Sequence, residues 1–520
     1  MIELRTTRPD APLWRTIFGR SLFASALVVL LAANVAEAQR TFGTLVLVEA
    51  APPAAGPSPL SAQTPADWRF VEMVYAPLFV DARGRTEPWL AQEMKPSNDG
   101  KTLTVTLKEN AVWSDGRSVS ALDVVYTYEL ARAGKWNNAW VDQLEPIASV
   151  NRSADGFDII FELKRPVQRP KRMLTVPLLP SGLHGPIDDP KRQRPLPTGV
   201  LGAGAYKPFR DGAHTQLVVN PQSIFKPKIS EIRILDAGTR EAAAEYVRVM
   251  GDAVTFDLTP EDAVIADEEH ATQRLKRTRR RLVALAFNPD HDMLSDATFR
   301  SAIRSALDRG ELFVRGERGR PSPAPVSTGS PDYPEGLKPP PRDAVEARRI
   351  LWYSDWERDV TESYFSRVLE AGQTQYAAFT MLVDADDDQQ MRRATLLRER
   401  LALAGINLKL DARPHIQFVD RVQSREFPCA LVAMGLEGLD PLRSLFHSKG
   451  GRNITNFNSP AVDAALDGSE RAKAIATITR SAPMIFMGVY EETGAAGKNV
   501  RVQYLSGRGG MARVDRWQIR

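Results

Sequence analysis

Residues 429–458, CALVAMGLEGLDPLRSLFHSKGGRNITNFN, decide the fold and raise the question of function. The apolar run at 430–434 predicts a buried strand, and residues 442–448 predict a short helix after it. Asp440 and Pro441 lie between the two, beyond a glycine-rich turn. Because α/β folds bind ligands just past the carboxyl ends of their strands, Asp440 is expected either to contact a ligand or only to cap the helix.

The segments before this stretch alternate between strand and helix patterns. In the order strand, helix, strand and helix, they are residues 379–383, 388–404, 406–412 and 416–425. Such alternation predicts a parallel sheet with right-handed crossovers. Since the carboxyl ends of parallel strands meet at one edge of a sheet, Asp384 and Asp440 are both expected at that edge.

Two stretches nearer the N-terminus also carry local signals. Ser120 and Asp123 have the spacing of a capping box, which predicts a helix after Ser120. The expected buried face of this helix consists of Leu122, Val125, Tyr126 and Leu130. Residues 274–281, RLKRTRRR, are expected to form a solvated rim beside a strand at 282–288. Contact with an anion or a membrane surface is the alternative for this basic run.

The N-terminus has the pattern of a secretory signal peptide. Arginines precede the apolar run SLFASALVVLL at 21–31, and AEA at 36–38 fits a cleavage site between Ala38 and Gln39. A membrane anchor is the alternative. Cys429 is the only cysteine, so no disulfide within the chain, CxxC motif or lipid-anchor cysteine is expected. These features predict a soluble periplasmic protein.

Length, charge and motifs restrict the function further. A chain of 520 residues exceeds one ordinary domain, which predicts two or three lobes. Its formal net charge of +4 comes from interspersed basic and acidic residues, so no nucleic-acid partner is expected. The sequence has no zinc-protease, serine-hydrolase, P-loop or EF-hand motif, and its six histidines lack ligand spacing. We therefore predict no enzyme activity, no catalytic residue, no metal and no cofactor.

Several stretches, spread over nearly all of the chain after residue 38, match one family in the right order. They are VYAPLFVDARGRTEPWLAQEM (74–94), SNDGKTLTVTLKENAVWSDGRSVSALDVVYTYEL (97–130), GAGAYKPF (202–209), FKPKISEIRIL (225–235), LVALAFNPD (282–290), FRSAIRSALDRGEL (299–312), LRERLALAGINLKL (397–410), LDPLRSLFHSKGGRNITNFNSPAVDAAL (439–466) and PMIFMGVYE (483–491). Together they resemble the extracellular solute-binding proteins of family 5, the dipeptide-, oligopeptide- and nickel-binding receptors of ABC importers.

The resemblance implies both a fold and an activity. The fold class would be α/β and periplasmic-binding-protein-like (type II, cluster C-like), with two hinged lobes and an extra α+β domain in the first lobe. Lobe I would hold residues 39–61, 198–288 and 483–520, the additional domain residues 62–197, and lobe II residues 289–482. A monomer would enclose a peptide or another small amine-bearing solute between its lobes and deliver it to an ABC permease complex in the inner membrane. A periplasmic hydrolase or a sensory receptor on the same scaffold is the alternative.

The resemblance also suggests ligand-binding residues. In peptide-binding members, an Asp of an Asp-Pro step pairs with the α-amino group of the peptide, and Asp440 matches that step. Arg443 is the candidate partner of a ligand carboxylate, and Trp68 is a candidate aromatic wall of the pocket. Helix capping by Asp440 ahead of Pro441 stays the alternative to ligand contact. The family's GTGPY is GAGAY here, at 202–206, which leaves the identity of the ligand open.

Overall fold

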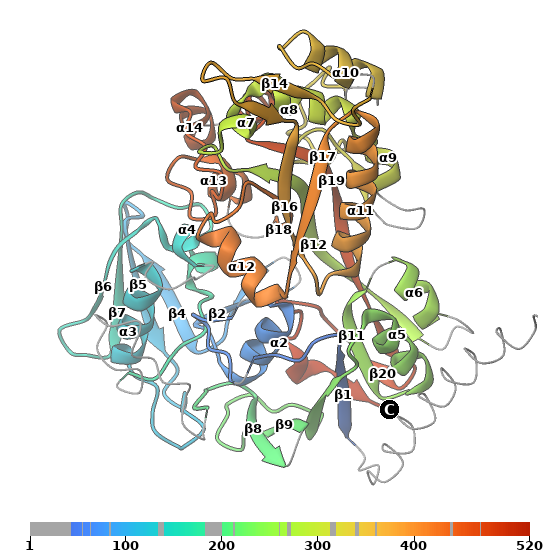
Figure 1. Ribbon diagram of the computed structural model, residues 1–520. Coiled ribbons are helices and arrows are strands. Elements are labelled where there is room, and N and C mark those ends of the chain that lie inside the picture. Colours follow the sequence, from blue (N-terminus) through green and yellow to red (C-terminus); the bar gives the residue numbers. More distant parts are fainter. Residues whose placement is uncertain are drawn as a thin grey trace, which may run out of the picture.

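The computed structural model describes residues 43–520 apart from several internal segments. The segments outside the description are residues 55, 63, 83–84, 134–139, 182–199, 212–213, 259, 268–271, 313–318, 339–342, 359–360, 437–439 and 469. The predicted signal peptide and its cleavage site at Ala38 and Gln39 also lie outside the described residues. Figure 1 shows an upper and a lower part of the molecule, joined by long strands.

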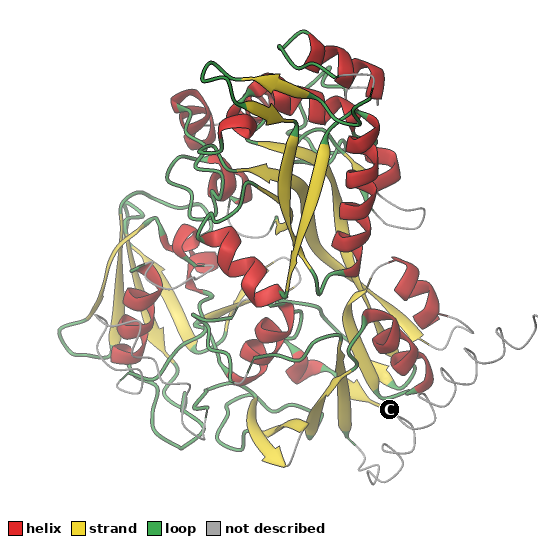
Figure 2. Ribbon diagram, viewed as in Figure 1, coloured by secondary structure: helices red, strands yellow, loops and turns green. Residues whose placement is uncertain are grey.

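One mixed sheet runs through both parts (Figures 1 and 2). Within the described residues it has eleven strands, in the spatial order β17 (Asn407–Arg413), β16 (Ala378–Asp384), β18 (Cys429–Gly435), β12 (Thr272–Phe287), β19 (Met484–Gly497), β11 (Ala253–Leu258), β1 (Thr44–Glu49), β10 (Glu231–Asp236), β9 (His214–Val219) and β8 (Tyr206–Asp211), with β13 (Arg320–Pro321) beside β19. The antiparallel strands β12 and β19 are 16 and 14 residues long and connect the two parts.

The basic run at 274–281 belongs to β12 itself, so the expectation of a rim beside a shorter strand was wrong. The strand begins at Thr272 because β19 offers it a partner along its length, with Leu275 opposite Gly494 near one end and Leu282 opposite Val489 farther along. Long-range pairing of this kind leaves no local signal in the basic run.

The upper part confirms the predicted parallel unit. β16 pairs in parallel with both β17 and β18. Both faces of this sheet are buried, because alternate residues of β12 enter different cores, with Leu285 on one face and Ala284 on the other. The helices over the first face are α7 (Asp292–Ser295), α8 (Ala297–Ala306), α9 (Arg309–Leu312), α10 (Ala344–Trp352) and α11 (Asp388–Leu403); those over the second are α12 (His415–Gln423), α13 (Pro441–Phe446), α14 (Pro460–Asp467) and α15 (Arg471–Ser481).

Cys429 lies in the core of the upper part and is fully buried. Burial raises the pKa of its thiol, so the side chain stays a neutral apolar group at ordinary pH. This agrees with the single cysteine being a packing residue.

The lower part combines the remaining strands of the large sheet with a second sheet. The second sheet and its helices are β4 (Ala91–Pro96), β5 (Thr102–Leu107), β7 (Asp158–Leu163), β6 (Ile147–Arg152), α3 (Ala121–Arg132) and α4 (Val141–Leu144). The other elements there are α2 (Pro65–Val74), α5 (Arg240–Val249), α6 (Pro260–Asp267), β2 (Phe79–Ala82), β3 (Arg85–Pro88), β20 (Val500–Arg501), β21 (Gln518–Ile519) and the 3₁₀ turns η1 (Pro170–Leu174) and η4 (Val514–Arg516). A hairpin of β14 (Ser366–Val368) and β15 (Thr374–Tyr376) belongs to the upper part.

The helix α3 begins as predicted, and its buried face agrees with the expected one only in part, since Leu130 is buried as expected. Ser120 accepts the N–H of Asp123 at 3.4 Å, and the Asp123 carboxylate accepts the N–H of Ser120 at 2.8 Å, which is the expected capping box. Leu122, expected in the core, is 48% exposed, and Val125 and Tyr126 are only half-buried. The side of the helix that carries Val124 and Tyr128 is fully buried, and there the hydroxyl of Thr127 accepts the N–H of Leu179 at 2.9 Å.

Among the described residues, every helix is too short or too polar to cross a bilayer.

Candidate functional site

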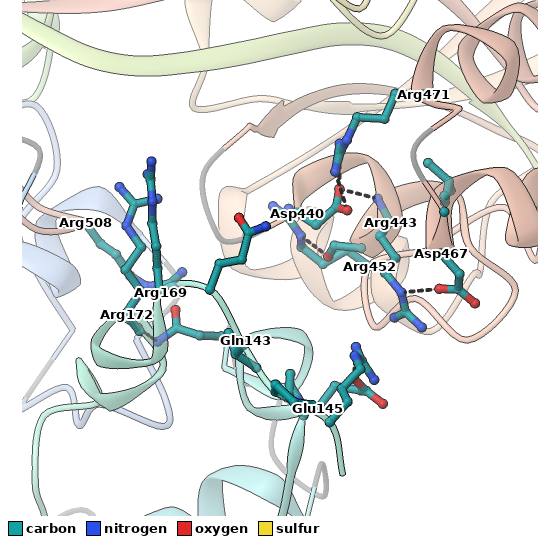
Figure 3. Close-up of a pocket in the computed structure, with 18 residues that line it drawn as sticks. Gln143, Glu145, Arg169, Arg172, Asp440, Arg443, Arg452, Asp467, Arg471 and Arg508 are labelled. Carbon is teal, nitrogen blue, oxygen red and sulfur yellow. Dashed lines mark hydrogen bonds and ion pairs between the residues drawn. The ribbon is translucent and has the colours of Figure 1, made fainter. Parts of the chain in front are cut away.

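A cavity of about 780 Å³ lies between segments that are far apart in sequence. The first wall comes from the lower part and consists of Gln143, Glu145, Pro146, residues 165–169, Arg172 and Arg508. The second wall comes from the upper part and consists of Asp440, Arg443, Ser444, Arg452, Leu466, Asp467, Gly468 and Arg471. Figure 3 shows the labelled side chains of both walls. The volume lies in the range of about 300–1,000 Å³ that is typical of small-molecule sites.

The first wall is organised around the loop that follows β7. Arg165 donates to Glu145 at 2.7 Å, and the amide of Gln143 donates to the backbone carbonyl of Arg172 at 2.8 Å. Arg172 lies in the turn η1, and Arg169 immediately precedes it. Within the part of the chain that the structure describes, the guanidinium groups of Arg169 and Arg172 have no carboxylate partner.

Arg508 enters the first wall from the C-terminal segment. Its guanidinium carbon lies 4.1 Å from the ring centroid of Trp140 and 5.1 Å from that of Trp68. The two tryptophan rings meet edge to face, with centroids 5.5 Å apart. Trp68 is only 6% exposed and does not line the cavity, so the structure places it behind Arg508. Direct contact between Trp68 and a ligand stays a prediction.

The backbone around Arg508 is held by α2. The carboxylate of Glu72 accepts the N–H groups of Gly509 at 2.7 Å and of Met511 at 2.9 Å. The helix α2 is in turn fixed by its buried Arg69, which donates to Glu49 and, at 2.8 Å, to Asp257. A charged group that has to be buried is tolerated when it is fully paired in this way. The position of Arg508 therefore follows from the packing of the lower part.

Asp440 in the second wall caps α13, as its Asp-Pro step predicts. Its Oδ1 accepts the N–H of Arg443 at 3.1 Å, and Pro441 occupies the first helical position. Arg471, the first residue of α15, donates to both carboxylate oxygens, at 3.2 Å to Oδ1 and through a shorter bond to Oδ2 (Figure 3). Capping is thus confirmed, and the carboxylate also has an ion-pair partner within its own wall. Contact between Asp440 and a ligand stays a prediction.

Arg443 lines the cavity, but its side chain is engaged as well. Its Nε donates to Asp467 at 2.9 Å, and His447 lies 3.3 Å from the other oxygen of the same carboxylate. Burial opposes ionisation of Asp467, yet the hydrogen bonds from Arg443 and His447 hold the pKa of this carboxyl below its usual value. Contact between Arg443 and a ligand carboxylate stays a prediction.

Arg452 joins the end of β18 to α13. It donates to the hydroxyl of Ser444 at 2.7 Å and to the carbonyl of Gly435 at 2.8 Å. The chain between the end of α13 and Arg452 turns back close to the helix. A Cβ atom at Gly450 would lie 2.4 Å from the carbonyl oxygen of Ser444. This close approach requires glycine and fixes the shape of the second wall.

The two walls are close enough to influence each other electrostatically. Burial opposes ionisation of Glu145, but the hydrogen bond from Arg165 and the nearby charges of Lys164 and Arg443 lower the pKa of this carboxyl overall. Arg443 acts from the second wall, across the cavity. Charges on either wall therefore act on anything that the cavity holds.

Asp384 follows a strand of the same parallel unit, and the parallel pairing of β16 with β18 places both strand ends at one edge, as expected. It nevertheless contributes nothing to the cavity lining. Its carboxylate lies 2.5 Å from Nδ1 of His415, at the start of α12. Among the described residues, no group of three or more acidic, histidine or cysteine side chains is arranged to hold a metal ion.

The sequence prediction found only two of the charged residues that meet at the cavity, Asp440 and Arg443. The others are Glu145, Arg165, Arg169, Arg172, Arg452, Asp467, Arg471 and Arg508. They come from separate segments and share no spacing, so only the tertiary fold brings them together. The proline- and arginine-rich composition of residues 165–172 was the one local signal, and it is equally typical of an exposed loop.

Comparisons with known proteins agree on one family. Residues 85–456 match the family model described as bacterial extracellular solute-binding proteins, family 5 middle. Protein XP55 from Streptomyces lividans is 26% identical over 400 residues, which cover 74% of this chain and 71% of that protein.

Solved structures give the same answer for the fold. The oligopeptide-binding protein AppA from Bacillus subtilis, in complex with a nonapeptide, superimposes with a TM-score of 0.79 at 19% identity, covering 92% of this chain and 99% of that one. NikZ from Campylobacter jejuni, in complex with Ni(L-His), gives a TM-score of 0.74 at 19% identity, covering 92% and 100%. At such low identity the likeness establishes the fold, which is the two-lobed α/β fold of type II periplasmic binding proteins.

Proposed function

Because the chain belongs to the bacterial extracellular solute-binding proteins of family 5, we propose that it captures a solute between its two walls and delivers it to an ABC permease. The observation that carries this proposal is the cavity of about 780 Å³, which is lined from both parts of the molecule. A site divided between two bodies closes when they move together, so binding and conformational change are coupled. The family and the fold are those of transport binding proteins, and binding requires no chemical step.

The connection between the two parts supports hinge closure. Within the described residues, β12 and β19 are the long strands that run from one part to the other, and their pairing is irregular between Lys276 and Arg280. Arg240 on α5 lies 3.3 Å from Asp387, the N-cap of α11, and forms a second contact between the parts. The irregular pairing of β12 with β19 is a suitable place for a small rotation, and the ion pair between Arg240 and Asp387 would respond to it.

We propose a peptide or another small amine-bearing solute as the ligand. The names of relatives such as the oligopeptide-binding protein AppA support this class. In this proposal, the ammonium group approaches Asp440 and a carboxylate approaches Arg443. An ammonium at Asp440 shares or replaces the bond from Arg471, which keeps the carboxylate paired whether the site is empty or filled.

The cellular setting follows from the same proposal. A family of extracellular binding proteins, together with the signal-peptide pattern of the N-terminus, supports export to the periplasm with cleavage between Ala38 and Gln39. We further propose that residues 39–61, 198–288 and 483–520 form lobe I, residues 62–197 its additional domain, and residues 289–482 lobe II. A monomer suffices, because one chain supplies both walls.

Native mass spectrometry of the purified protein with a peptide library tests this function, followed by calorimetry on the peptides that are retained. We expect specific retention of a subset of peptides and a decrease in the radius of gyration, measured by small-angle scattering, when they bind. Tight binding of a solute without an amine, and of no peptide, would refute the peptide part. Conversion of a retained solute into a product by the purified protein would contradict the binding-only role.

A further inference from the structure

A cluster of charged side chains lies where the upper and lower parts meet, outside the cavity lining. It consists of Asp384, Asp386 and Asp387, which end β16 or follow it, His415 at the start of α12, and Arg240 at the start of α5. The helix α5 belongs to the lower part, and the other four residues belong to the upper part (Figure 1). A change in the charge of this cluster therefore acts on a contact between the two parts.

His415 is held against the aspartates by its backbone and by its ring. The carboxylate of Asp386 accepts the N–H of His415 at 2.8 Å, and Nδ1 of the ring lies 2.5 Å from the carboxylate of Asp384. Burial opposes protonation of the ring, but the hydrogen bond to Asp384 and the charges of the three aspartates raise the pKa of His415 above its ordinary 6.5 overall. The ring therefore changes its charge near neutral pH.

The other charged groups around His415 are exposed or paired with each other. The helix α12 packs against β16 and β17. Besides the aspartates of the cluster, the charged residues nearby are Lys409, Asp411 and Arg413 of β17, Asp420 and Arg421 of α12, and Asp388 of α11. Asp411 pairs with Arg413 at 2.6 Å and with Arg421 at 2.5 Å, while Lys409, Asp388 and Asp420 are exposed. The three aspartates of the cluster are thus the charges that act most directly on the ring.

Asp387 connects the cluster to the lower part. Its Oδ1 accepts the N–H groups of Gln389 and Gln390, both at 3.1 Å, and lies 3.3 Å from Nη1 of Arg240. Burial opposes ionisation of Asp387, but the charge of Arg240 and the hydrogen bonds hold the pKa of this carboxyl below its ordinary value. The charge of Asp387 in turn raises the pKa of Arg240. This ion pair keeps its charges near neutral pH, so His415 is the group of the cluster that titrates there.

We propose that the cluster is a pH-sensitive latch, in which neutral His415 leaves the aspartates free to attract Arg240 and protonated His415 weakens that contact. A protonated ring offsets one of the three negative charges and repels the guanidinium group of Arg240. The contact is therefore strongest above the pKa of His415 and weakens as the pH falls through it. The inference goes beyond the proposed function and takes from it only that the two parts move relative to each other.

Spin labels on Val249→Cys in α5 and Leu403→Cys in α11 test the latch by double electron–electron resonance from about pH 5 to 8. Both positions are exposed, whereas the native Cys429 is fully buried, so labelling is selective. We expect the arrangement with the contact between Arg240 and Asp387 to lose population about two- to fivefold as the pH falls, the range that a partly exposed ion pair supports.

Three variants in the labelled protein assign this change to the cluster. His415→Gln should remove the pH dependence, and Arg240→Gln should remove it while keeping the distances seen at low pH. His291→Gln, at the N-cap of α7 outside the cluster, is the matched control and should leave the pH dependence intact. Because coupling between two sites is reciprocal, the pKa of His415, measured by NMR of its ring protons, should rise in Arg240→Gln.

The outcomes separate the latch from the proposed function. Distances that do not depend on pH, a pH dependence that survives His415→Gln, or an unchanged pKa of His415 in Arg240→Gln would each overturn the latch. The proposed function stands in these cases if members of the peptide library still change the distance between the labels. If neither pH nor any peptide of the library changes it, the two parts do not move, and the latch and the proposed function both fail.

Discussion

The two walls of the cavity are both rich in arginine but hold it in different ways. In the second wall, Arg471 and Arg443 donate to carboxylates of the same wall. In the first wall, Arg508 lies against aromatic rings, and Arg169 and Arg172 have no carboxylate partner within the described residues. The two carboxylates of the second wall are thus paired with arginines of that wall, whereas Arg169 and Arg172 of the first wall have no ion pair within the described residues.

This difference shows which charges serve the fold and which serve binding. The second wall is built from the ends of α13, α14 and α15: Asp440 caps α13 and pairs with Arg471 at the start of α15, and Arg443 pairs with Asp467 at the end of α14. The first wall includes the loop between β7 and η1, where Arg165 pairs with Glu145 but Arg169 and Arg172 have no ion pair within the described residues. Arginines that line a cavity without an ion-pair partner are candidates for ligand contact, because a bound anion would compensate their charge.

Reversing the charge of the first wall should give the largest effect. The double substitution Arg169→Glu and Arg172→Glu replaces attraction by repulsion, so the affinity for tri-glutamate should fall at least about 100-fold, or about 2.7 kcal/mol. The thermal midpoint should stay within a few degrees, because neither side chain has an ion pair to lose among the described residues. Calorimetry and thermal melts measure both quantities. Arg152→Glu, at an exposed position of β6 outside the cavity, is the control, and an unchanged affinity in the double variant would remove the functional distinction between the walls.

Distorting the backbone of the second wall should have the next largest effect, and it should act on stability. In Gly450→Ala, the new Cβ meets the carbonyl oxygens of Ser444 at 2.4 Å and Arg443 at 2.6 Å, so α13 has to move. We expect a loss of about 1–3 kcal/mol in the free energy of unfolding, measured by urea denaturation. Gly468→Ala, in the same wall, places its Cβ 3.3 Å from its nearest neighbour and should cost less. Equal losses would mean that the close approach at Gly450 does not shape this wall.

These walls also show what could be predicted from sequence. The alternating strands and helices, the capping box at Ser120 and the Asp-Pro cap at Asp440 depend on neighbours within a few residues, and the structure confirms them. The GAGAY sequence at 202–206 leads directly into β8. The reason for its glycines is nonlocal, because a Cβ at Gly202 would lie 2.0 Å from the carbonyl oxygen of Val74.

The remaining features depend on contacts between distant segments. The buried side of α3 contacts Leu179, about 50 residues later in the chain, and β12 extends to Thr272 by pairing with β19. Trp68 has the aromatic side chain that is expected in the wall of a pocket. However, Arg508, over 400 residues later in the chain, lies between Trp68 and the cavity. Composition could not reveal the arginines of the cavity either, because a mildly basic chain gives no sign of where its arginines converge.

Removing the cap at Asp440 should separate its structural role from its binding role. Asp440→Ala loses the acceptor for the N–H of Arg443 and should reduce the free energy of unfolding by about 1 kcal/mol. Asp440→Asn keeps an acceptor for the cap and loses only the charge, so its stability should fall less. If Asp440 binds an amine, both variants should weaken an amine-bearing peptide relative to its N-acetylated form in calorimetry. Full affinity for the free amine in both variants would leave Asp440 with the cap alone.

The smallest effect concerns the pH dependence of the ion pair between Arg443 and Asp467. The folded pKa of Asp467 lies below its usual 3.8. The stability that the pair contributes is therefore fully present above the unfolded pKa and is lost as the pH falls through the lower, folded value. Because Asp467 is 54% exposed, the contribution should be about 0.2–1 kcal/mol.

The difference in unfolding free energy between the native protein and Asp467→Asn should thus be constant near neutral pH and vanish on strong acidification. Urea denaturation across that pH series measures it. Glu145→Gln provides the counterpart on the first wall, where the carboxyl pKa is also lowered. Removing this negative charge should in addition raise the affinity for tri-glutamate, since a negative charge on the first wall repels an acidic peptide. A difference that persists at the lowest pH would show that Asp467 contributes through packing and not through its charge, and the second wall would then be less of an ionic network than its geometry indicates.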